Sequence, residues 1–212
     1  MFIEVHMHQG NYKMPRTSVH QLLDDKLIIF LRSWGSQDYD QKFIEEVMHF
    51  LSTAQADINV TSPFDYLENL TSLANKVRIS LLLAHDYFNK IENKNSLSVG
   101  FETTVLMKVK NEIAWAAVGR FDLYKINDQG LQILSATGSD QDQFVLLPVD
   151  LLGVEKNFEM RCGSIQATNE PLLISSTYKN SLKLQNGENL QNEVVEHSDP
   201  NGTYWFSKIK SE

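Results

Sequence analysis

Hydrophobic positions in the first 31 residues predict three β-strands. Met1–Met7 alternates in the manner of a short strand, and Ser18–Leu23 is a second strand candidate. Leu27–Leu31 is a compact apolar run, which suits a buried strand better than a helix of that length.

A first helix is predicted after Gly35. Phe43, Val47 and Phe50 recur at spacings of four and three, which is the helical period. Asp38 lies near the start of this pattern, where negative charge suits the helix dipole.

A longer second helix is predicted downstream. Ser62-Pro63 is typical of a helix cap followed by proline at the first helical position, and the helix should end in the polar stretch 93–96. Its apolar stripe consists of Leu67, Leu70, Ala74, Val77, Leu81, Ala84, Phe88 and Ile91.

From Thr103 onward, short β-rich runs alternate with turn residues. The predicted strands are Thr103–Val109, Ile113–Val118, Phe121–Ile126, Leu131–Leu134, Phe144–Leu147, Phe158–Cys162, Ser164–Ala167, Leu172–Ser175 and Thr203–Ile209. Turn chemistry at 110–111 and 127–130 makes the first of these successive antiparallel hairpins. Asn180–Asn192 is polar without a clean period and reads as a surface loop or a frayed helix. Two helices followed by antiparallel strands predict an α+β chain.

Composition narrows the class of protein. The 212 residues suffice for one substantial core, so we expect a single domain over residues 1–212. The net charge of −8, without a basic run, argues against a nucleic-acid partner. A single cysteine, Cys162, excludes an intrachain disulfide and favours a reducing, cytoplasmic setting. No apolar run approaches the roughly 20 residues that cross a bilayer, so we expect no membrane segment.

Four segments in order carry a family resemblance. They are Leu27–Ser36, then Gly100–Leu106 with Ile113–Phe121 and Leu123–Ile126, then Leu172–Thr177, and finally Asn201–Phe206. Together they resemble the metal-dependent type 2C-like (PPM) protein phosphatases. That family has an Asp-Gly-x-Gly-Gly loop after the first of these strands, a Gly-Thr-Thr strand, a Val-Gly-Asp-Ser segment, a Ser-Asp-Gly segment and a final Asp-Asn-x-Thr strand. The resemblance implies an α-β-β-α sandwich with two mainly antiparallel sheets flanked by helices.

The resemblance also implies two divalent cations held by carboxylates, which activate a water that attacks the phosphoryl group. The corresponding residues of this chain do not suit that role. Arg32 stands where the Asp-Gly loop has its aspartate, Ser33 replaces the glycine, and Ser176 replaces the aspartate of Ser-Asp-Gly. Pro200 stands at the first position of the final Asp-Asn, and His20 falls in the first strand's Asn-Glu-Asp element. A guanidinium about 4 Å from a divalent ion meets a repulsion of roughly 8 kcal/mol at an effective dielectric of 20.

We therefore expect a catalytically inactive pseudophosphatase without metal or cofactor, which acts as a binding or regulatory module in signalling. Its partner would be a protein, phosphorylated or unphosphorylated, bound through Arg16, Arg32 or Trp34. Trp34 is expected at a loop tip, beside Gly35. The alternative for Arg32 is an internal ion pair with a neighbouring carboxylate, and we favour that alternative. For Arg16 the alternative is a plain surface residue, and we favour that alternative as well.

Two other functions stay open. A divergent phosphoprotein phosphatase would need a non-standard metal site, and a structural or oligomerising module would need neither ligand nor metal. The side chains considered for a replacement site are His6, His8 and His20, or Asp38, Asp40 and Asp122, but ordinary structural roles are favoured for all six. A buried strand position is likewise favoured over a nucleophilic role for Cys162.

Overall fold

The contacts of the chain divide it into two compact units. The computed structural model describes residues 1–10, 14–56, 62–128, 130–137, 148, 150–178 and 203–210. Unit 1 comprises Met1–Met14, Arg120–Leu147 and Thr168–Glu212, whereas unit 2 comprises Pro15–Gly119 and Pro148–Ala167. Each unit is built on one five-stranded sheet. A single domain over residues 1–212 stays a prediction.

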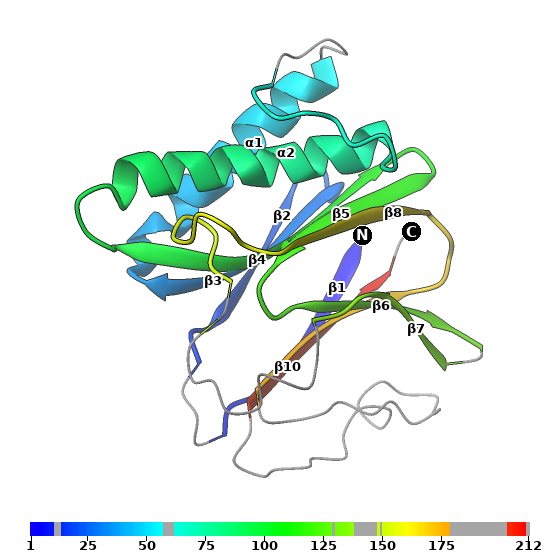
Figure 1. The fold of residues 1–212 in the computed structure, drawn as a ribbon. Helices are drawn as coiled ribbons and strands as arrows, with labels where there is room; N and C mark the ends of the chain where they lie inside the picture. The colour runs from blue at the N-terminus through cyan, green and yellow to red at the C-terminus, as the bar shows by residue number, and fades with distance from the viewer. Residues whose placement is uncertain are drawn as a thin grey trace. The chain divides into compact units, whose positions relative to one another are not determined.

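Unit 2 is a sheet covered on one face by two helices (Figure 1). The sheet has the order β2-β3-β4-β5-β8, and every neighbouring pair is antiparallel. Its strands are β2 (Thr17–Leu22), β3 (Leu27–Gly35), β4 (Val99–Val109), β5 (Glu112–Val118) and β8 (Met160–Gln166). Its helical segments are η1 (Gln37–Tyr39), α1 (Asp40–Ala56), α2 (Ser72–Tyr87) and the π-helix η2 (Phe88–Glu92).

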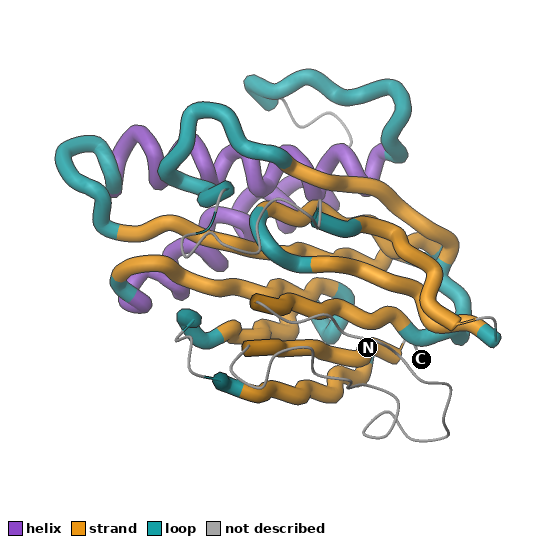
Figure 2. The backbone as a smooth tube through the Cα atoms, turned by 60° about the horizontal axis from the view of Figure 1, so that its bottom comes forward, coloured by secondary structure: helices purple, strands orange, loops and turns teal. Residues whose placement is uncertain are grey.

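Unit 1 is a second antiparallel sheet with the order β1-β10-β9-β6-β7. Its strands are β1 (Phe2–His8), β6 (Asp122–Asn127), β7 (Gly130–Ser135), β9 (Leu172–Tyr178) and β10 (Thr203–Lys210). Because β1 pairs with β10 along its whole length, from Phe2 opposite Lys210 to His8 opposite Tyr204, the two ends of the chain lie close together (Figure 2).

The core of unit 2 lies between its sheet and its helices. Leu27, Ile29 and Leu31 alternate along β3 and are fully buried in the cluster that also contains the apolar residues of α1 and α2. The ring of Phe101 on β4 lies 4.6 Å from that of Phe43 and 4.7 Å from that of Phe88, measured between centroids. Full burial of each such side chain contributes about 1.5–3 kcal/mol, so this cluster fixes the helices on the sheet.

The first predicted helix is confirmed, but the start of the second is wrong. The chain from Ser62 to Leu70 forms turns, and α2 begins after Thr71, whose hydroxyl accepts a hydrogen bond from Ala74 N. The side chain of Asn75 bonds to the backbone of both Leu67 and Leu70, which holds that segment out of the helix. The predicted end is confirmed, because the π-helix η2 stops at Glu92.

Most predicted strands are confirmed, with two corrections. Phe158–Cys162 and Ser164–Ala167 are not two strands, because β8 runs unbroken through Gly163. Phe121–Ile126 does not pair with the strand before it, since β5 and β6 belong to different sheets. The candidates Phe144–Leu147 and Asn180–Asn192 lie outside the described residues.

The α+β class with two antiparallel sheets is confirmed. Among the helices that the structure describes, none is long and apolar enough to cross a membrane.

Candidate functional site

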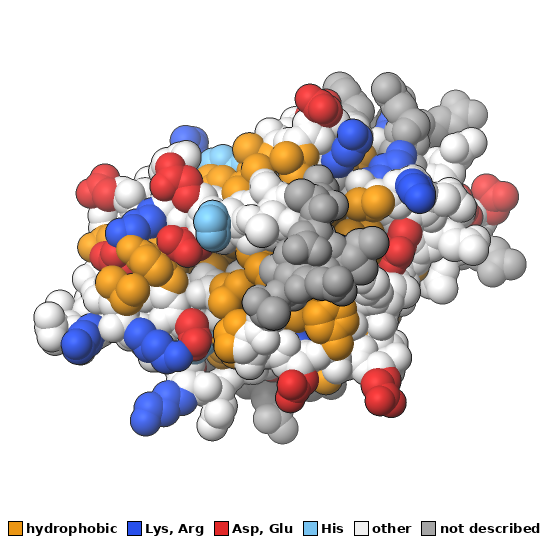
Figure 3. All heavy atoms as spheres, turned by 90° about the horizontal axis from the view of Figure 1, so that it is seen from above, with side chains coloured by type: hydrophobic (Ala, Val, Ile, Leu, Met, Phe, Trp, Pro, Cys, Tyr) orange, Lys and Arg blue, Asp and Glu red, His pale blue; other side chains and the backbone are white. Residues whose placement is uncertain are grey.

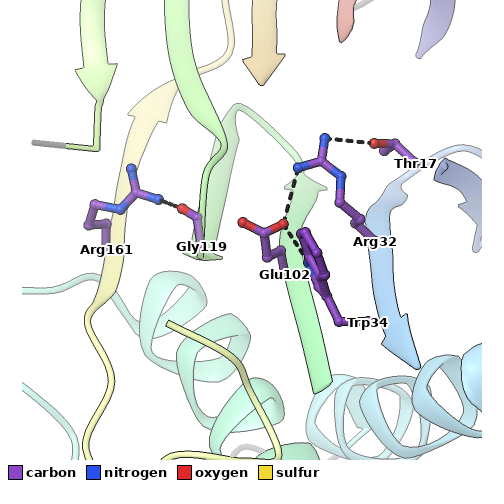
Figure 4. Close-up of polar contacts among 6 residues, drawn as sticks. All are labelled: Thr17, Arg32, Trp34, Glu102, Gly119 and Arg161. Atoms are coloured by element: carbon purple, nitrogen blue, oxygen red, sulfur yellow. Dashed lines mark hydrogen bonds and ion pairs between the residues drawn. The ribbon is translucent and has the colours of Figure 1, made fainter. Parts of the chain in front are cut away.

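Arg32, which the sequence resemblance predicts at a degenerate metal-site position, forms a buried ion pair. In the antiparallel register of β3 and β4, Arg32 lies directly opposite Glu102. Arg32 Nη1 donates to Glu102 Oε2 over 3.1 Å, and the side chains of the two residues are only 3% and 0% exposed. Arg32 Nη2 donates to Thr17 Oγ1 on β2, also over 3.1 Å (Figure 4). The Arg32 guanidinium thus bonds to both strands that flank β3, namely β2 and β4.

Trp34 shares the same carboxylate. Its indole Nε1 donates to Glu102 Oε2 over 2.8 Å, so this oxygen accepts from both Trp34 and Arg32 (Figure 4). Trp34 lies within β3 and is half-buried, which corrects its expected place at a loop tip. A buried carboxylate needs hydrogen-bond donors, and Arg32 and Trp34 supply two of them.

Gly119, directly after β5, lies against the side chain of Glu102. A Cβ on Gly119 would stand 2.5 Å from Glu102 Cγ, and the residue has a φ of +82°. Both the contact and the backbone conformation therefore require glycine. Its carbonyl accepts from Arg161 Nη2 on β8 over 2.5 Å (Figure 4). We call Thr17, Arg32, Trp34, Glu102, Gly119 and Arg161 the Arg32–Glu102 cluster.

Ser33 makes a different contact from its neighbour Arg32. Its hydroxyl donates to the carboxylate of Asp40, the first residue of α1. His20 on β2 forms a hydrogen bond of 2.9 Å between Nε2 and Ser18 Oγ. Burial lowers the pKa of His20, although the charge of Asp40 acts in the opposite direction. The structure thus brings Ser33 and Asp40 together, with Asp40 close enough to influence His20.

The remaining candidates have local roles or lie elsewhere. Asp122 in unit 1 accepts from the backbone N and the hydroxyl of Thr137, over 2.7 and 2.9 Å, and so fastens the chain after β7. Ser176 is buried in β9, opposite Trp205. Arg16 is exposed just before β2.

Five further candidates remain, namely Asp38, His6, His8, Pro200 and Cys162. Asp38 lies in η1, where its backbone N donates to the capping Ser36. His6 and His8 lie in β1, and Pro200 lies outside the described residues. The pKa of the half-buried Cys162 thiol is raised by burial, which disfavours the thiolate that a nucleophile needs.

The residues of unit 2 do not fit the family's metal pair. A ligand carboxylate must offer lone pairs to the ion, but Arg32 brings only donors and already neutralises Glu102. Ser33 likewise donates its hydroxyl to Asp40. Within the described ranges, no group of three or more His, Cys, Asp or Glu side chains is arranged to hold a metal ion.

Sequence reasoning favoured a carboxylate partner for Arg32 but missed Glu102. The two residues are 70 positions apart, so no local pattern links them. The available signal was an acidic residue inside the apolar run of β4, where a charge requires a counter-charge. Glu102 is therefore the counter-charge that the buried Arg32 needs.

Solved phosphatase structures share the fold over the whole chain. The PPM Ser/Thr phosphatase MsPP of Mycobacterium smegmatis has a TM-score of 0.61 and 11% identity, with 100% of this chain and 99% of that chain covered. The serine/threonine phosphatase PstP of Mycobacterium tuberculosis gives 0.58 and 12%, with 100% and 99% covered. PppA of Pseudomonas aeruginosa, a regulatory component of a type VI secretion system, gives 0.58 and 11%, with 99% and 97% covered. No protein-family model matches the sequence, and no curated protein matches it either.

These similarities define the fold as that of the PPM phosphatases, as the sequence resemblance implied. Identities near 11% carry the fold and not the chemistry. One of these relatives, the catalytic domain of PstP, was solved with two manganese ions. The chemistry of the present chain must therefore be argued from its own residues.

Proposed function

We propose that this protein is a pseudophosphatase: a PPM-type fold without two-metal chemistry that serves as a binding or regulatory module in signalling. The observation that carries the proposal is the Arg32–Glu102 ion pair, because the sequence resemblance predicts a metal-ligating aspartate at position 32. The guanidinium supplies within the chain the positive charge that a bound cation would otherwise bring.

The energetics of burial support this proposal. A carboxylate as fully enclosed as that of Glu102 is strongly destabilised unless it is paired and hydrogen-bonded. Arg32 and Trp34 meet that need without an ion. A divalent cation at this place would have to displace an arginine whose side chain is 3% exposed and bonded to two strands. The Arg32–Glu102 ion pair therefore opposes metal binding, and Arg32 offers no ligand atom to a metal ion.

The experiment is a calorimetric titration of Mn²⁺ and Mg²⁺ into the purified protein, with hydrolysis of an aryl phosphate followed in the same samples. We expect neither saturable binding at millimolar metal nor turnover. Tight binding with turnover that stops on metal removal would overturn the proposal and favour a phosphatase with a non-standard site.

A matched pair of variants tests the role of the ion pair itself. Arg32→Asp places two carboxylates on neighbouring strands, so the variant should melt at a lower temperature, and Mn²⁺ should raise its Tm. Arg32→Asn removes the guanidinium without adding a second carboxylate, so Mn²⁺ should help it less. Equal responses of both variants to Mn²⁺ would contradict the idea that Arg32 stands in for a cation.

Binding to a protein partner needs residues that the fold leaves accessible. Because Arg32 is bonded inside the protein, the candidate contacts are Arg16, just before β2, and the half-buried Trp34. On the helix-covered face, charged side chains of both signs are scattered among apolar ones (Figure 3). Binding to a phosphopeptide library, compared with binding to the same peptides without phosphate, distinguishes a phosphorylated partner from an unphosphorylated one. If Arg16 binds the phosphate, Arg16→Ala should abolish the preference for the phosphorylated peptides.

A further inference from the structure

β1 lies at the edge of its sheet, and folded proteins usually protect such edge strands from pairing with another chain. In the sheet of unit 1, β1 pairs with β10 through seven consecutive residues without a break in register. The described residues place no strand on its other side. An outer strand of this kind presents a row of backbone donors and acceptors to another chain.

The other edge strands of the two sheets carry protective features that β1 lacks. The pairing of β7 with β6 contains an irregularity at Leu123 and Tyr124, β2 directly follows Pro15-Arg16, and β8 contains Arg161. Bulges, prolines and cationic side chains are the usual means of keeping an edge from pairing. The sequence of β1, FIEVHMH, has no proline, lysine or arginine, and Glu4 is its one acidic residue.

The exposed apolar side chains of β1 point to the same conclusion. Val5 is 47% exposed and Met7 is 49% exposed, and with Ile3 they share one face of the strand because alternate residues point the same way. Apolar side chains at alternate positions of an open edge would gain by contact with a further strand.

We propose that β1 pairs antiparallel with β1 of a second copy of this chain, about a two-fold axis at Val5. That register sets Val5 opposite its own counterpart and Ile3 opposite Met7 of the second copy. Apolar residues then lie opposite apolar ones at positions 3, 5 and 7, and Glu4 lies opposite His6 of the second copy, so β1 is complementary to itself. Because such a two-fold contact is closed, it yields a dimer and not a fibre. This inference goes beyond the proposed function.

The first test is the mass of the intact protein by light scattering after size-exclusion chromatography, over a range of concentrations. We expect twice the chain mass of 24.3 kDa. Val5→Lys should give a folded monomer, because a lysine at the axis faces a second lysine across the strands. Ile133→Lys is the matched control: Ile133 is 64% exposed on β7, at the other edge of the same sheet, so this variant should remain a dimer.

A cysteine test fixes the register and does not depend on the stability of a lysine variant. In a Cys162→Ser background, Val5→Cys places two thiols directly opposite each other, with Cβ atoms about 4.5–5.5 Å apart, so mild oxidation should give a covalent dimer. Met7→Cys should not cross-link with itself, because the two copies of position 7 lie about 13 Å apart along the strands. A mixture of Ile3→Cys and Met7→Cys should cross-link.

Three results would overturn the proposal. The first is a wild-type protein that stays monomeric at every concentration, which would leave this edge to an extended segment of another protein. The second is a folded Val5→Lys variant that stays dimeric, which would place the interface elsewhere. The third is Met7→Cys cross-linking with itself as readily as Val5→Cys, which would exclude the register.

Discussion

Arg32 and Glu102 face each other across β3 and β4, although 70 residues separate them in the sequence. Their side chains are almost completely buried, and the carboxylate oxygen that Arg32 reaches also accepts from Trp34. In the sheet of unit 2, each of these charges depends on the other. The buried pair is therefore a structural requirement of this sheet.

Removing the negative partner should destabilise the protein strongly. Glu102→Gln leaves a buried guanidinium without its counter-charge, which costs about 3–5 kcal/mol in comparable pairs. The free energy of unfolding, measured by urea denaturation, should fall by that amount. Asp86→Asn provides the control, because Asp86 and Lys90 form an exposed pair on α2 and η2 whose loss should change stability by less than about 1 kcal/mol. Equal effects would show that burial of the Arg32–Glu102 pair carries no extra cost.

Gly119 and Gly130 both have a left-handed backbone, but only Gly119 has close neighbours. Substitutions at the two positions therefore distinguish backbone strain from side-chain crowding. Gly119 has a φ of +82° and a Cβ there would meet Glu102, whereas Gly130 has a φ of +114° and open space around its Cβ position. Gly119→Ala should therefore lower the Tm clearly more than Gly130→Ala, because only the former displaces the Glu102 side chain. Thermal melting of both variants beside the wild type measures the difference. A larger loss in Gly130→Ala would contradict the contact between Gly119 and Glu102.

The sequence predicted most elements because their signals are local. Phe43, Val47 and Phe50 recur at the helical period, and their burial against β3 confirms α1. What the sequence did not predict depends on contacts between distant positions. The glycine at 163 read as a break between strands, yet it lies against the ring of Trp115, where a Cβ would meet that ring at 2.8 Å.

In the candidate site, too, the features with a local sequence signal were predicted and those that depend on distant contacts were not. The family resemblance predicts from the sequence alone that Arg32 stands in place of an aspartate. The identity of its partner is not, because it depends on the register of β3 with β4. Trp34 was predicted at a loop tip, since the family has its metal loop there, but β3 continues through Gly35.

The true start of α2 can be tested by its cap. Thr71 Oγ1 accepts from Ala74 N over 3.2 Å, so Thr71→Ala should cost about 1 kcal/mol of stability. Ser62 Oγ accepts from Phe64 N in the preceding turn and caps no helix, so Ser62→Ala should cost less than about 0.5 kcal/mol. Chemical denaturation of the two variants compares these values. The reverse order would restore Ser62-Pro63 as the helix start.

His85 should make the stability of unit 2 depend on pH. It is buried on α2, its Nδ1 accepts from Gly153 N over 3.0 Å, and its ring lies 4.6 Å from that of Phe158. Burial lowers the pKa of His85 from its usual value of 6.5; the charge of Asp86 opposes this shift and that of Lys90 reinforces it. The unfolded chain therefore takes up a proton at a higher pH than the folded chain does. Stability from this group is complete above pH 6.5 and is lost as the pH falls toward the lower, folded pKa.

The measurement is the free energy of unfolding from about pH 7.5 to about pH 5.5, where an ordinary histidine titrates. His85→Gln keeps an acceptor for Gly153 N but cannot gain a proton, so its stability should fall less steeply with acid than that of the wild type. His20, whose pKa is also lowered by burial, stays in both proteins and its contribution cancels. Parallel pH curves for the two proteins would mean that His85 accepts its proton in the folded state as readily as in the unfolded one. The hydrogen bond from Gly153 would then not hold the imidazole neutral.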